Sequence, residues 1–440
     1  STDTSSKTVL ERSFLPTDAH SFVKYYNGAD ISKLTPYSTD ISMCNTTYAT
    51  SGNSKDVTAP PLVRVAQGNF SMWTAHEQLQ CQWNEDNDNS NNNQPLVTGI
   101  PADDEPPYKA SSGSAEFIVR VEVCKSSALA EENCRVYPSG NSKPIGTLQE
   151  HGEDGSVKFG LMTGSYQKTK AGGVLRKNVS DFSDEVDETT DGRFTSPPPS
   201  DSIVDTLNKL RLPRYDYGSH QYNSLDSCTF AQFGFTDGQC SNWGNPQSEI
   251  YLESLRYFGG LSATAAFAAN DSTYINGLTS ASWSDPLDNT NYCAPVNVIH
   301  FNASTSSFDG DQLSGFGSLP GSPSADTWTD KVGAGGVDPN ITSSGNYFVG
   351  SVDGTTSAGD KSCTPKDLDN LSDATGVCPE APWLEGTYQI AGLAYYANQN
   401  SIRTDLDDTN GDEADIRVKT YGVALSPAQP IIRVPPLTGS

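Results

Sequence analysis

The order in which strand patterns and helix patterns follow one another constrains this chain more than any other feature of its sequence. Strands are predicted at four places: 115–124, 157–163, 296–301 and 418–425. In the first, Phe117, Val119 and Val121 alternate with mostly polar residues, which is typical of a strand with one solvated face. The run over 296–301 is mostly apolar and predicts a buried strand.

Helices are predicted where apolar residues recur every three to four positions. They cover 202–212, 246–258 and 383–398. Ser200 or Asp201 is the expected N-cap of the first helix. The second helix is the best marked, because Pro246 suits a first turn and Gly259 with Gly260 ends the pattern. Strands alternating with helices are typical of a parallel sheet, so we expect an α/β fold.

The remaining segments lack such patterns. Residues 1–114 predict an irregular N-terminal segment, in which 84–107 forms a low-complexity polar loop. Residues 303–380 are rich in Gly, Ser, Asp and Thr and predict a long loop insertion, a kind of segment that often carries function. Prolines in 426–440 predict an exit linker. We therefore expect one α/β domain over 115–425 between these flanking segments.

The net charge of the chain argues against some classes of binding partner. With 28 basic and 54 acidic residues the net charge is −26. Such a surface repels nucleic-acid phosphates and anionic lipid headgroups, so we expect no nucleic-acid partner. No apolar run approaches the roughly 18 residues that span a bilayer, so we expect no membrane insertion. The chain opens on Ser1 without a signal peptide, which indicates a removed leader or an internal fragment.

The cysteines indicate an oxidising compartment. There are nine, with no C-x-x-C motif and no histidine at zinc-finger spacing, which argues against structural zinc. Pairs close in sequence are disulfide candidates, and a wider pair is a weaker fourth: Cys124 with Cys134, Cys228 with Cys240, Cys363 with Cys378, and Cys44 with Cys81. Cys293 is left over, with a partner expected outside this segment. Spacing alone leaves the connectivity open.

One acidic turn is the best candidate for a metal site. Oxygen ligands for calcium could come from four residues around a glycine: Asp408, Asn410, Asp412 and Asp415. The EF-hand pattern fails here, because placing Gly411 at the sixth position puts Leu406 at the first. A solvated acidic turn is the simpler alternative. No cofactor other than this calcium is expected.

Catalytic signatures are missing from the sequence. The five histidines are scattered, and neither a G-x-S-x-G nucleophile motif nor a phosphate-binding loop occurs. We therefore expect a protein that is not an enzyme. A hydrolase would need a carboxylate pair or a triad assembled from distant positions.

Two stretches, 158–177 and 238–258, stand out among several that together resemble one known family. The others include 68–73, 119–124, 291–302, 393–398 and 418–424. The combination resembles the PilY/PilC family, large secreted proteins at the tip of bacterial type IV pili. The resemblance implies a non-catalytic protein that promotes pilus assembly and mediates adhesion. Minor pilins of the tip complex and a host or abiotic surface are the implied partners. The implied location is the cell surface or the exterior, reached through the periplasm.

The resemblance also implies a fold and a degenerate metal site. The family's N-terminal half is similar to a von Willebrand factor A domain and is typically followed by a β-propeller, so the chain is expected to be an N-terminal portion. We therefore expect a degenerate von Willebrand A-like central sheet flanked by helices, with long irregular loops closed by disulfides. Two of that fold's metal-ligand positions fall on Asn245 and Asn302. Asparagine offers an oxygen but no charge, so binding should be weak or lost.

A different class of function is the alternative. An extracellular calcium-binding structural or matrix protein could use the same fold. It predicts bound calcium at 408–415 and a melting temperature that rises with calcium.

Overall fold

A computed structural model describes most of the chain after residue 132. The described residues are 124, 133–195, 199, 201–210, 235–240, 244–334, 341–342, 344–352, 361–378, 382–408 and 410–425, together with the backbone of five short strands elsewhere. The chain divides into two compact units, one of 1–146, 188–192 and 211–223, the other of the remaining residues. The predicted low-complexity loop 84–107 and exit linker 426–440 lie outside the described residues. The predicted domain boundaries stay predictions.

The first unit contains small antiparallel sheets. β1 (Ile41–Asn45), β2 (Leu62–Gln67) and β3 (Glu116–Ile118) form one sheet in that order. β4 (Cys134–Val136) pairs with β5 (Ser142–Pro144), and β8 (Tyr215–Asp216) pairs with β9 (Gln221–Tyr222). β3 lies within the strand predicted at 115–124. The other strands of this unit were not predicted.

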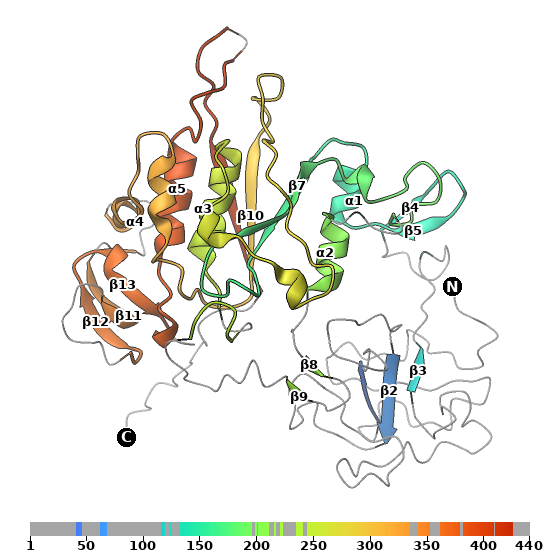
Figure 1. Cartoon of the computed structure of the whole chain (residues 1–440), viewed down its shortest axis with the longest axis horizontal. Coiled ribbons are helices and arrows are strands. Elements are labelled where there is room, and N and C mark those ends of the chain that lie inside the picture. The colour runs from blue at the N-terminus through green and yellow to red at the C-terminus, as the bar shows by residue number, and fades with distance from the viewer. Residues whose placement is uncertain are drawn as a thin grey trace, which may run out of the picture. The chain divides into compact units, whose positions relative to one another are not determined.

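A parallel strand pair and two helices form the main core of the second unit (Figure 1). β10 (Val296–Asn302) pairs in parallel with β14 (Val418–Ala424), in a register that runs from Val296 opposite Val418 to Asn302 opposite Ala424. α3 (Gln247–Phe258) and α5 (Gln389–Gln399) pack against this pair. Apolar side chains from all four elements meet in one cluster that includes Leu252, Leu255, Leu393, Val296 and Val418.

The sequence signals for α3 lie at its two ends. Pro246 is the N-cap residue rather than a residue of the first turn as predicted, and Gly259 is the C-cap residue. Gly260 follows with a φ of +68°, a conformation that costs glycine little, so the chain turns away from the helix. α5 begins later than the predicted 383, because residues 382–384 form a separate 3₁₀ turn, η11 (Pro382–Leu384).

A hairpin and three short helical segments form a second part of this unit. β6 (Phe159–Thr163) pairs with the longer β7 (Val174–Ser180). α1 (Thr147–Gly152), η5 (Phe182–Asp184) and α2 (Ile203–Lys209) lie beside them. The N-cap of α2 is Ser202, whose side chain accepts a hydrogen bond from Asp205 N, so the prediction of Ser200 or Asp201 was wrong. The helix begins at the buried Ile203, so the cap lies one residue after Asp201.

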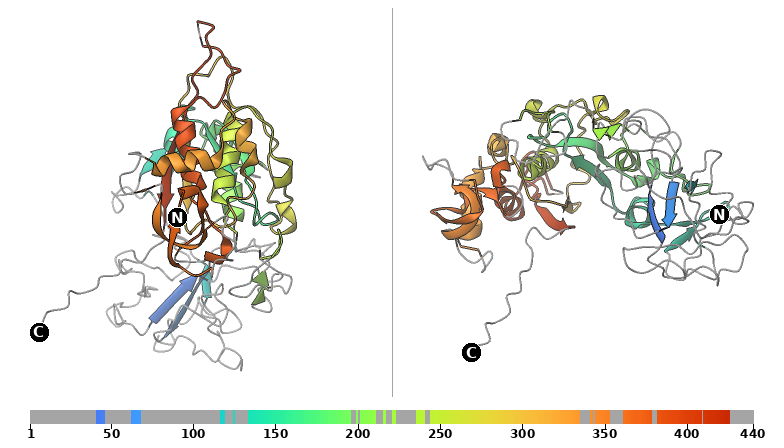
Figure 2. Two further views of the ribbon diagram at one scale, coloured as in Figure 1. Left: turned by 90° about the vertical axis from the view of Figure 1, so that its left-hand side faces the viewer. Right: turned by 90° about the horizontal axis from the view of Figure 1, so that it is seen from below.

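Residues 303–380 correct the prediction of a long loop. They contain η9 (Leu313–Ser318), α4 (Ala325–Gly333), β11 (Gly345–Val352), β12 (Thr364–Leu368), η10 (Leu371–Asp373) and β13 (Ala374–Val377). The three strands form one antiparallel sheet with β11 in the middle. Figures 1 and 2 place these orange elements together beside α5. Tertiary pairing, rather than an apolar period in the sequence, gives them their structure.

The fold class is confirmed as mixed α/β with small sheets and disulfide-closed segments. A central von Willebrand A-like sheet is not shown, because the strands of the described residues form separate sheets of two or three strands. The prediction that 296–301 is buried was wrong for one face: Ile299 is 67% and Phe301 63% exposed. In the described part of the chain, no helix has both the length and the apolar character needed to cross a bilayer.

Candidate functional site

The carboxyl end of β10 and the start of α3 bring the two predicted asparagines together. Asn245 Nδ2 lies 3.1 Å from Asn302 Oδ1, 3.0 Å from Ser304 Oγ and 2.9 Å from the Thr305 carbonyl oxygen. These contacts join residues about 60 positions apart in sequence. The resemblance placed both asparagines at one site, and the structure makes them direct neighbours.

Further hydrogen bonds fix this asparagine site. Asn245 N donates to Ser307 Oγ at 2.7 Å, and Ser307 N donates to the Asn245 carbonyl at 2.9 Å. Gln247 Nε2 donates to the Ser304 carbonyl at 3.1 Å, and Gln247 Oε1 lies 2.9 Å from His300 Nε2. Burial lowers the pKa of His300, so the ring is neutral at pH 7 and its Nε2 donates to Gln247.

At the asparagine site, three uncharged oxygen atoms surround the side-chain amide group of Asn245. Asn302 Oδ1, Ser304 Oγ and the Thr305 carbonyl could each contribute an oxygen to a cation, but the Asn245 amide group already donates toward them. Among the described residues, no group of three or more His, Cys, Asp or Glu side chains is arranged to hold a metal ion. A metal at Asn245 and Asn302 therefore stays a prediction.

Carboxylates buried behind this site were not predicted. Glu249 and Asp309 are each fully buried. Gly172 N and Gln312 N donate to Glu249 at 2.6 and 3.1 Å, while Asp309 accepts from both the backbone and the side chain of Thr387. Burial raises the pKa of Asp309, and burial above all raises the pKa of Glu249 to about 8. At pH 7 Glu249 is mainly protonated.

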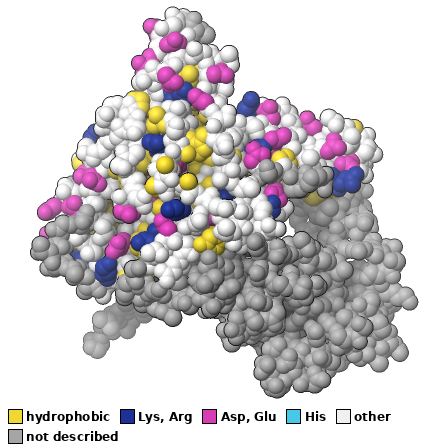
Figure 3. Space-filling view, in the orientation of Figure 1, with side chains coloured by type: hydrophobic (Ala, Val, Ile, Leu, Met, Phe, Trp, Pro, Cys, Tyr) yellow, Lys and Arg dark blue, Asp and Glu magenta, His cyan; other side chains and the backbone are white. Residues whose placement is uncertain are grey.

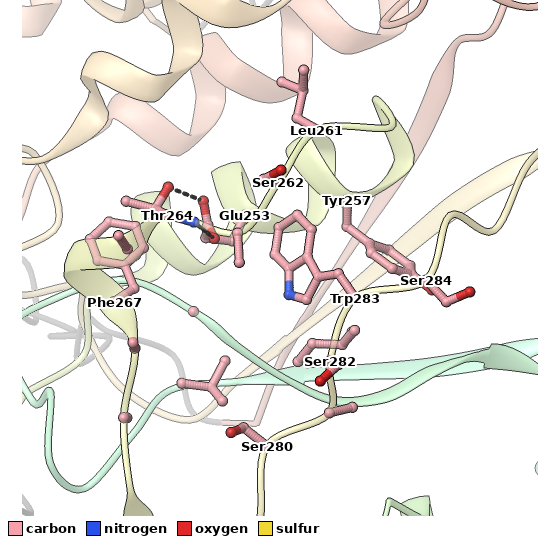
Figure 4. A pocket seen from close by; sticks show the side chains of 18 of the residues that line it. Glu253, Tyr257, Leu261, Ser262, Thr264, Phe267, Ser280, Ser282, Trp283 and Ser284 are labelled. Carbon is pink, nitrogen blue, oxygen red and sulfur yellow. Dashed lines mark hydrogen bonds between the residues drawn. The ribbon is translucent and has the colours of Figure 1, made fainter.

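The same face of α3, one to two turns further along at Glu253 and Tyr257, borders a cleft of about 610 Å³. β7, the loop after α3 and the extended segment 280–285 form its walls. Figure 4 shows the ring of Trp283 pointing from that segment toward α3. Tyr257 lies on one side of the ring, and Glu253 with Thr264 lies on the other. The rings of Tyr257 and Trp283 meet edge to face, with centroids 5.4 Å apart. Little in the sequence indicates this cleft beyond the many Ala, Gly and Ser residues over 259–284, whose small side chains leave space.

The predicted calcium residues lie on a tight turn between α5 and β14. Asp408 Oδ1 accepts hydrogen bonds from Asn410 N at 2.7 Å and Asp412 N at 2.9 Å, and these bonds lower the pKa of Asp408. Asp415 pairs with Arg417 at 2.9 Å. In the described turn, the carboxylates of Asp408 and Asp415 thus already bind protein groups. Calcium at this turn stays a prediction.

Two of the predicted disulfides are present. Cys124 joins Cys134, and Cys363 joins Cys378, each with Cα atoms 5.9 Å apart. Cys240 is also disulfide-bonded, whereas its predicted partner Cys228 lies outside the described residues. Cys44 belongs to a strand described by its backbone only, and Cys81 lies outside the described residues. Cys293 is free and exposed in this chain, and a partner outside the segment stays a prediction.

One face of the β10–β14 pair is apolar and exposed. It carries Ile299, Phe301, Tyr421 and Val423, from 39% to 67% exposed, and Leu425 follows at 62%. Ile299 lies opposite Tyr421 and Phe301 opposite Val423, so the four side chains form one block. Elsewhere, Figure 3 shows acidic side chains spread over the described surface with basic ones between them.

Comparison with known proteins supplies the remaining findings. Residues 159–397 match the family model described as "PilY1 homolog, second domain", and residues 1–66 match "PilY1 homolog, small alpha/beta domain". No solved structure matches the chain.

Two curated relatives from Xylella fastidiosa (strain Temecula1) are similar to the chain, and each is named "Type IV pilus biogenesis factor PilY1 homolog". One is 30% identical over 471 aligned positions, which cover 98% of this chain and 30% of the relative. The other is 27% identical over 210 positions, which cover 42% of this chain and 16% of the relative. The chain thus spans less than a third of the length of either.

Proposed function

The chain belongs to the PilY1 homologue family, and from this premise we propose that it acts, without catalysis, in type IV pilus biogenesis. The match of a family domain over 159–397 is the observation that carries the proposal, because it includes α3, β10 and most of α5. The names of the two relatives point to the same process. The chain spans 30% of the first relative, so the role is proposed for this part within a larger activity.

Adhesion is the second part of the proposal. We propose that the protein reaches the cell surface, joins the tip complex through minor pilins, and contacts a host or abiotic surface. The exposed apolar face of β10 and β14 supports a role in protein contacts, because parallel strands are normally covered on both faces.

A von Willebrand A-like arrangement is part of the same proposal. Its support is the parallel β10–β14 pair, with α3 beginning beside the carboxyl end of β10. Ligand sites of open parallel sheets lie at that end of the strands. Asn245 and Asn302 would then occupy ligand positions of a site in which an amide replaces the charge.

Surface piliation tests the biogenesis role. The gene is deleted, pili are sheared from the cells, and the major pilin in the sheared fraction is quantified. We expect pilin to fall sharply in the deletion strain and to return with the complementing gene. Normal piliation in the deletion strain would contradict the proposal.

A matched pair of variants tests the chain itself. Complementation with Leu252→Asp, which places a charge in the core between α3 and the strands, should fail to restore pili. Glu150→Gln, on the exposed side of α1, should restore them fully. Adhesion is measured separately, on strains whose piliation is equal.

A further inference from the structure

The cleft beside α3 has a fixed shape. Thr264 is held by the buried Glu253, which accepts from Thr264 N at 3.0 Å and from Thr264 Oγ1 at 2.6 Å. On the other wall, Ala281 N donates to the Leu175 carbonyl at 2.8 Å. Asn178 bonds the Ser282 carbonyl and Ser284 N at 2.9 and 2.8 Å. Both walls are therefore formed before any ligand arrives, which lowers the entropy that binding costs.

The acidic side chains that line the cleft already bind other groups of the protein. Glu253 and Asp285 are the acidic residues of its lining, and the lining includes no Lys or Arg. Glu253 holds Thr264, and Asp285 forms two bonds with Arg403 at 2.6 and 3.0 Å. A charged ligand would find no partner here, and a net charge of −26 opposes an anion further. The cleft is therefore suited to a neutral ligand.

Neutral polar groups of the cleft remain unused. The hydroxyls of Ser262, Ser280 and Ser282 make no hydrogen bond to any residue that the structure describes, and neither does the indole N–H of Trp283. Each serine hydroxyl can donate one hydrogen bond and accept two. Figure 4 shows Ser262 on the α3 side of Trp283 and Ser280 with Ser282 on the other. Hydroxyls thus lie on both sides of one aromatic ring.

An aromatic ring between hydroxyls matches the two-sided chemistry of a sugar. A pyranose has a face of C–H bonds that packs on an aromatic ring, and a rim of hydroxyls that need hydrogen-bond partners. A volume of about 610 Å³ lies in the range of small-ligand sites. We propose that this cleft binds a neutral carbohydrate, with a sugar ring against Trp283 and its hydroxyls bonded to Ser262, Ser280 and Ser282. The inference rests on the proposed adhesion role, for which it names a ligand class.

Binding is tested on the purified chain by saturation-transfer NMR. The probes are maltotriose, cellotriose and triacetylchitotriose as neutral sugars, trigalacturonate as an anion of the same size, and acetyl-trialanine amide as a peptide. We expect transfer to at least one neutral trisaccharide, with a Kd on the order of 1 mM or tighter. We expect no transfer to trigalacturonate. Transfer to the peptide alone, or to none of the three neutral sugars, would overturn the proposal.

Variants assign the binding to the cleft. Trp283→Ala should weaken binding about tenfold, and Trp283→Phe should retain most of it, because the ring remains. Ser282→Leu should abolish binding by filling the cleft, without removing a ring that packs on Tyr257. Phe348→Ala, an exposed aromatic outside the cleft lining, is the matched control and should bind like the wild type. Unchanged binding in Ser282→Leu would place the sugar elsewhere and overturn the assignment.

The outcome can be separated from that of the pilus proposal. Ser282→Leu should complement the deletion strain for piliation, because the cleft is not part of the core between α3 and the strands. Loss of sugar binding with normal pili supports both proposals. Absence of sugar binding in the wild-type chain, with pili still dependent on the gene, removes the carbohydrate inference alone.

Discussion

At the scale of single residues, the polar side of α3 shows what an apolar pattern leaves out. Ile250, Leu255 and Phe258 mark an apolar stripe, and Glu249 and Glu253 lie outside it, where a polar side chain ordinarily faces solvent. Both are fully buried instead, because the 159–180 hairpin region and the loop after the helix cover that face. A helical pattern shows which residues share a face, but it cannot show that a second layer covers the polar one.

The buried Glu249 makes stability depend on pH. Its pKa rises from 4.5 to about 8 in the folded state, so the folded chain binds more protons than the unfolded chain between these values. Stability should therefore fall as pH rises from 5 to 8. Each pKa unit corresponds to about 1.4 kcal/mol, so the loss amounts to a few kcal/mol. Urea unfolding at pH 5, 6.5 and 8 measures it.

Two substitutions isolate the contribution of Glu249. Glu249→Gln should flatten this pH dependence, and the slope that remains belongs to Asp309 and Glu253, whose pKa values are also raised by burial. The exposed Glu150→Gln should keep the wild-type slope. An equal slope in all three proteins would show that Glu249 is ionised when folded.

The asparagine site yields a prediction about charge and metal. Asn245→Asp replaces a donor with a carboxylate that faces three oxygens within 3.1 Å, so it should destabilise the fold by about 2–3 kcal/mol, more than Asn245→Ala. Millimolar Mg²⁺ or Ca²⁺ should recover part of that loss if the oxygens retain a cation geometry. Thermal unfolding with and without EDTA measures both effects. Asn297→Asp, on an exposed position of β10, is the control and should respond to neither.

At the scale of elements, the helices and strands whose apolar residues recur regularly could be predicted from the sequence. The strands without such a pattern could not. α3, β10 and β14 were found within one residue of their ends, and α5 was found with its start predicted too early. The strands of the 345–377 sheet were missed, because β12 contains Pro365, Lys366 and Asp367 and β13 contains Gly376. These strands depend on their neighbours and a disulfide rather than on intrinsic preference.

The Cys363–Cys378 disulfide should stabilise that small sheet. It joins the residue before β12 to the residue after β13 across a separation of 15 residues. Removing a crosslink of this span costs about 3 kcal/mol. In Cys363→Ser/Cys378→Ser, hydrogen exchange at the backbone amides of β11 should accelerate, while exchange in α3 should change little. Cys293→Ser, which removes a free exposed thiol, should leave β11 unaffected. Equal protection in the double variant would contradict the role of the disulfide.

At the scale of the whole molecule, the family was identifiable from sequence and the cleft was not. The resemblance drew on short stretches along most of the chain, which is also how far the curated relative matches it. The cleft depends on how β7, the loop after α3 and 280–285 approach one another, and no local pattern encodes that approach. Asn245 and Asn302 were paired only through the resemblance, since 57 positions separate them.

Calcium dependence is a property of the whole molecule that the acidic turn predicts. Because Asp408 and Asp415 already accept hydrogen bonds, calcium has to compete, and we expect a Kd in the millimolar range of weak extracellular sites. At 10 mM calcium the melting temperature should rise by a few degrees, and EDTA should reverse the rise. Asp412→Asn should reduce the effect. No shift at 10 mM would contradict a calcium site and leave a solvated acidic turn.

The parallel pairing of β10 with β14 determines how the second unit responds to mechanical tension. The chain enters the pair at Val296 and leaves it at Ala424, and the register places these residues at opposite ends. A pull between them slides the strands along each other and loads the hydrogen bonds of the ladder together. In an antiparallel hairpin pulled at its two free ends, the bonds would instead break one after another. The β10–β14 pair is therefore loaded in shear. When one hydrogen bond between the strands breaks, the force is shared among all those that remain.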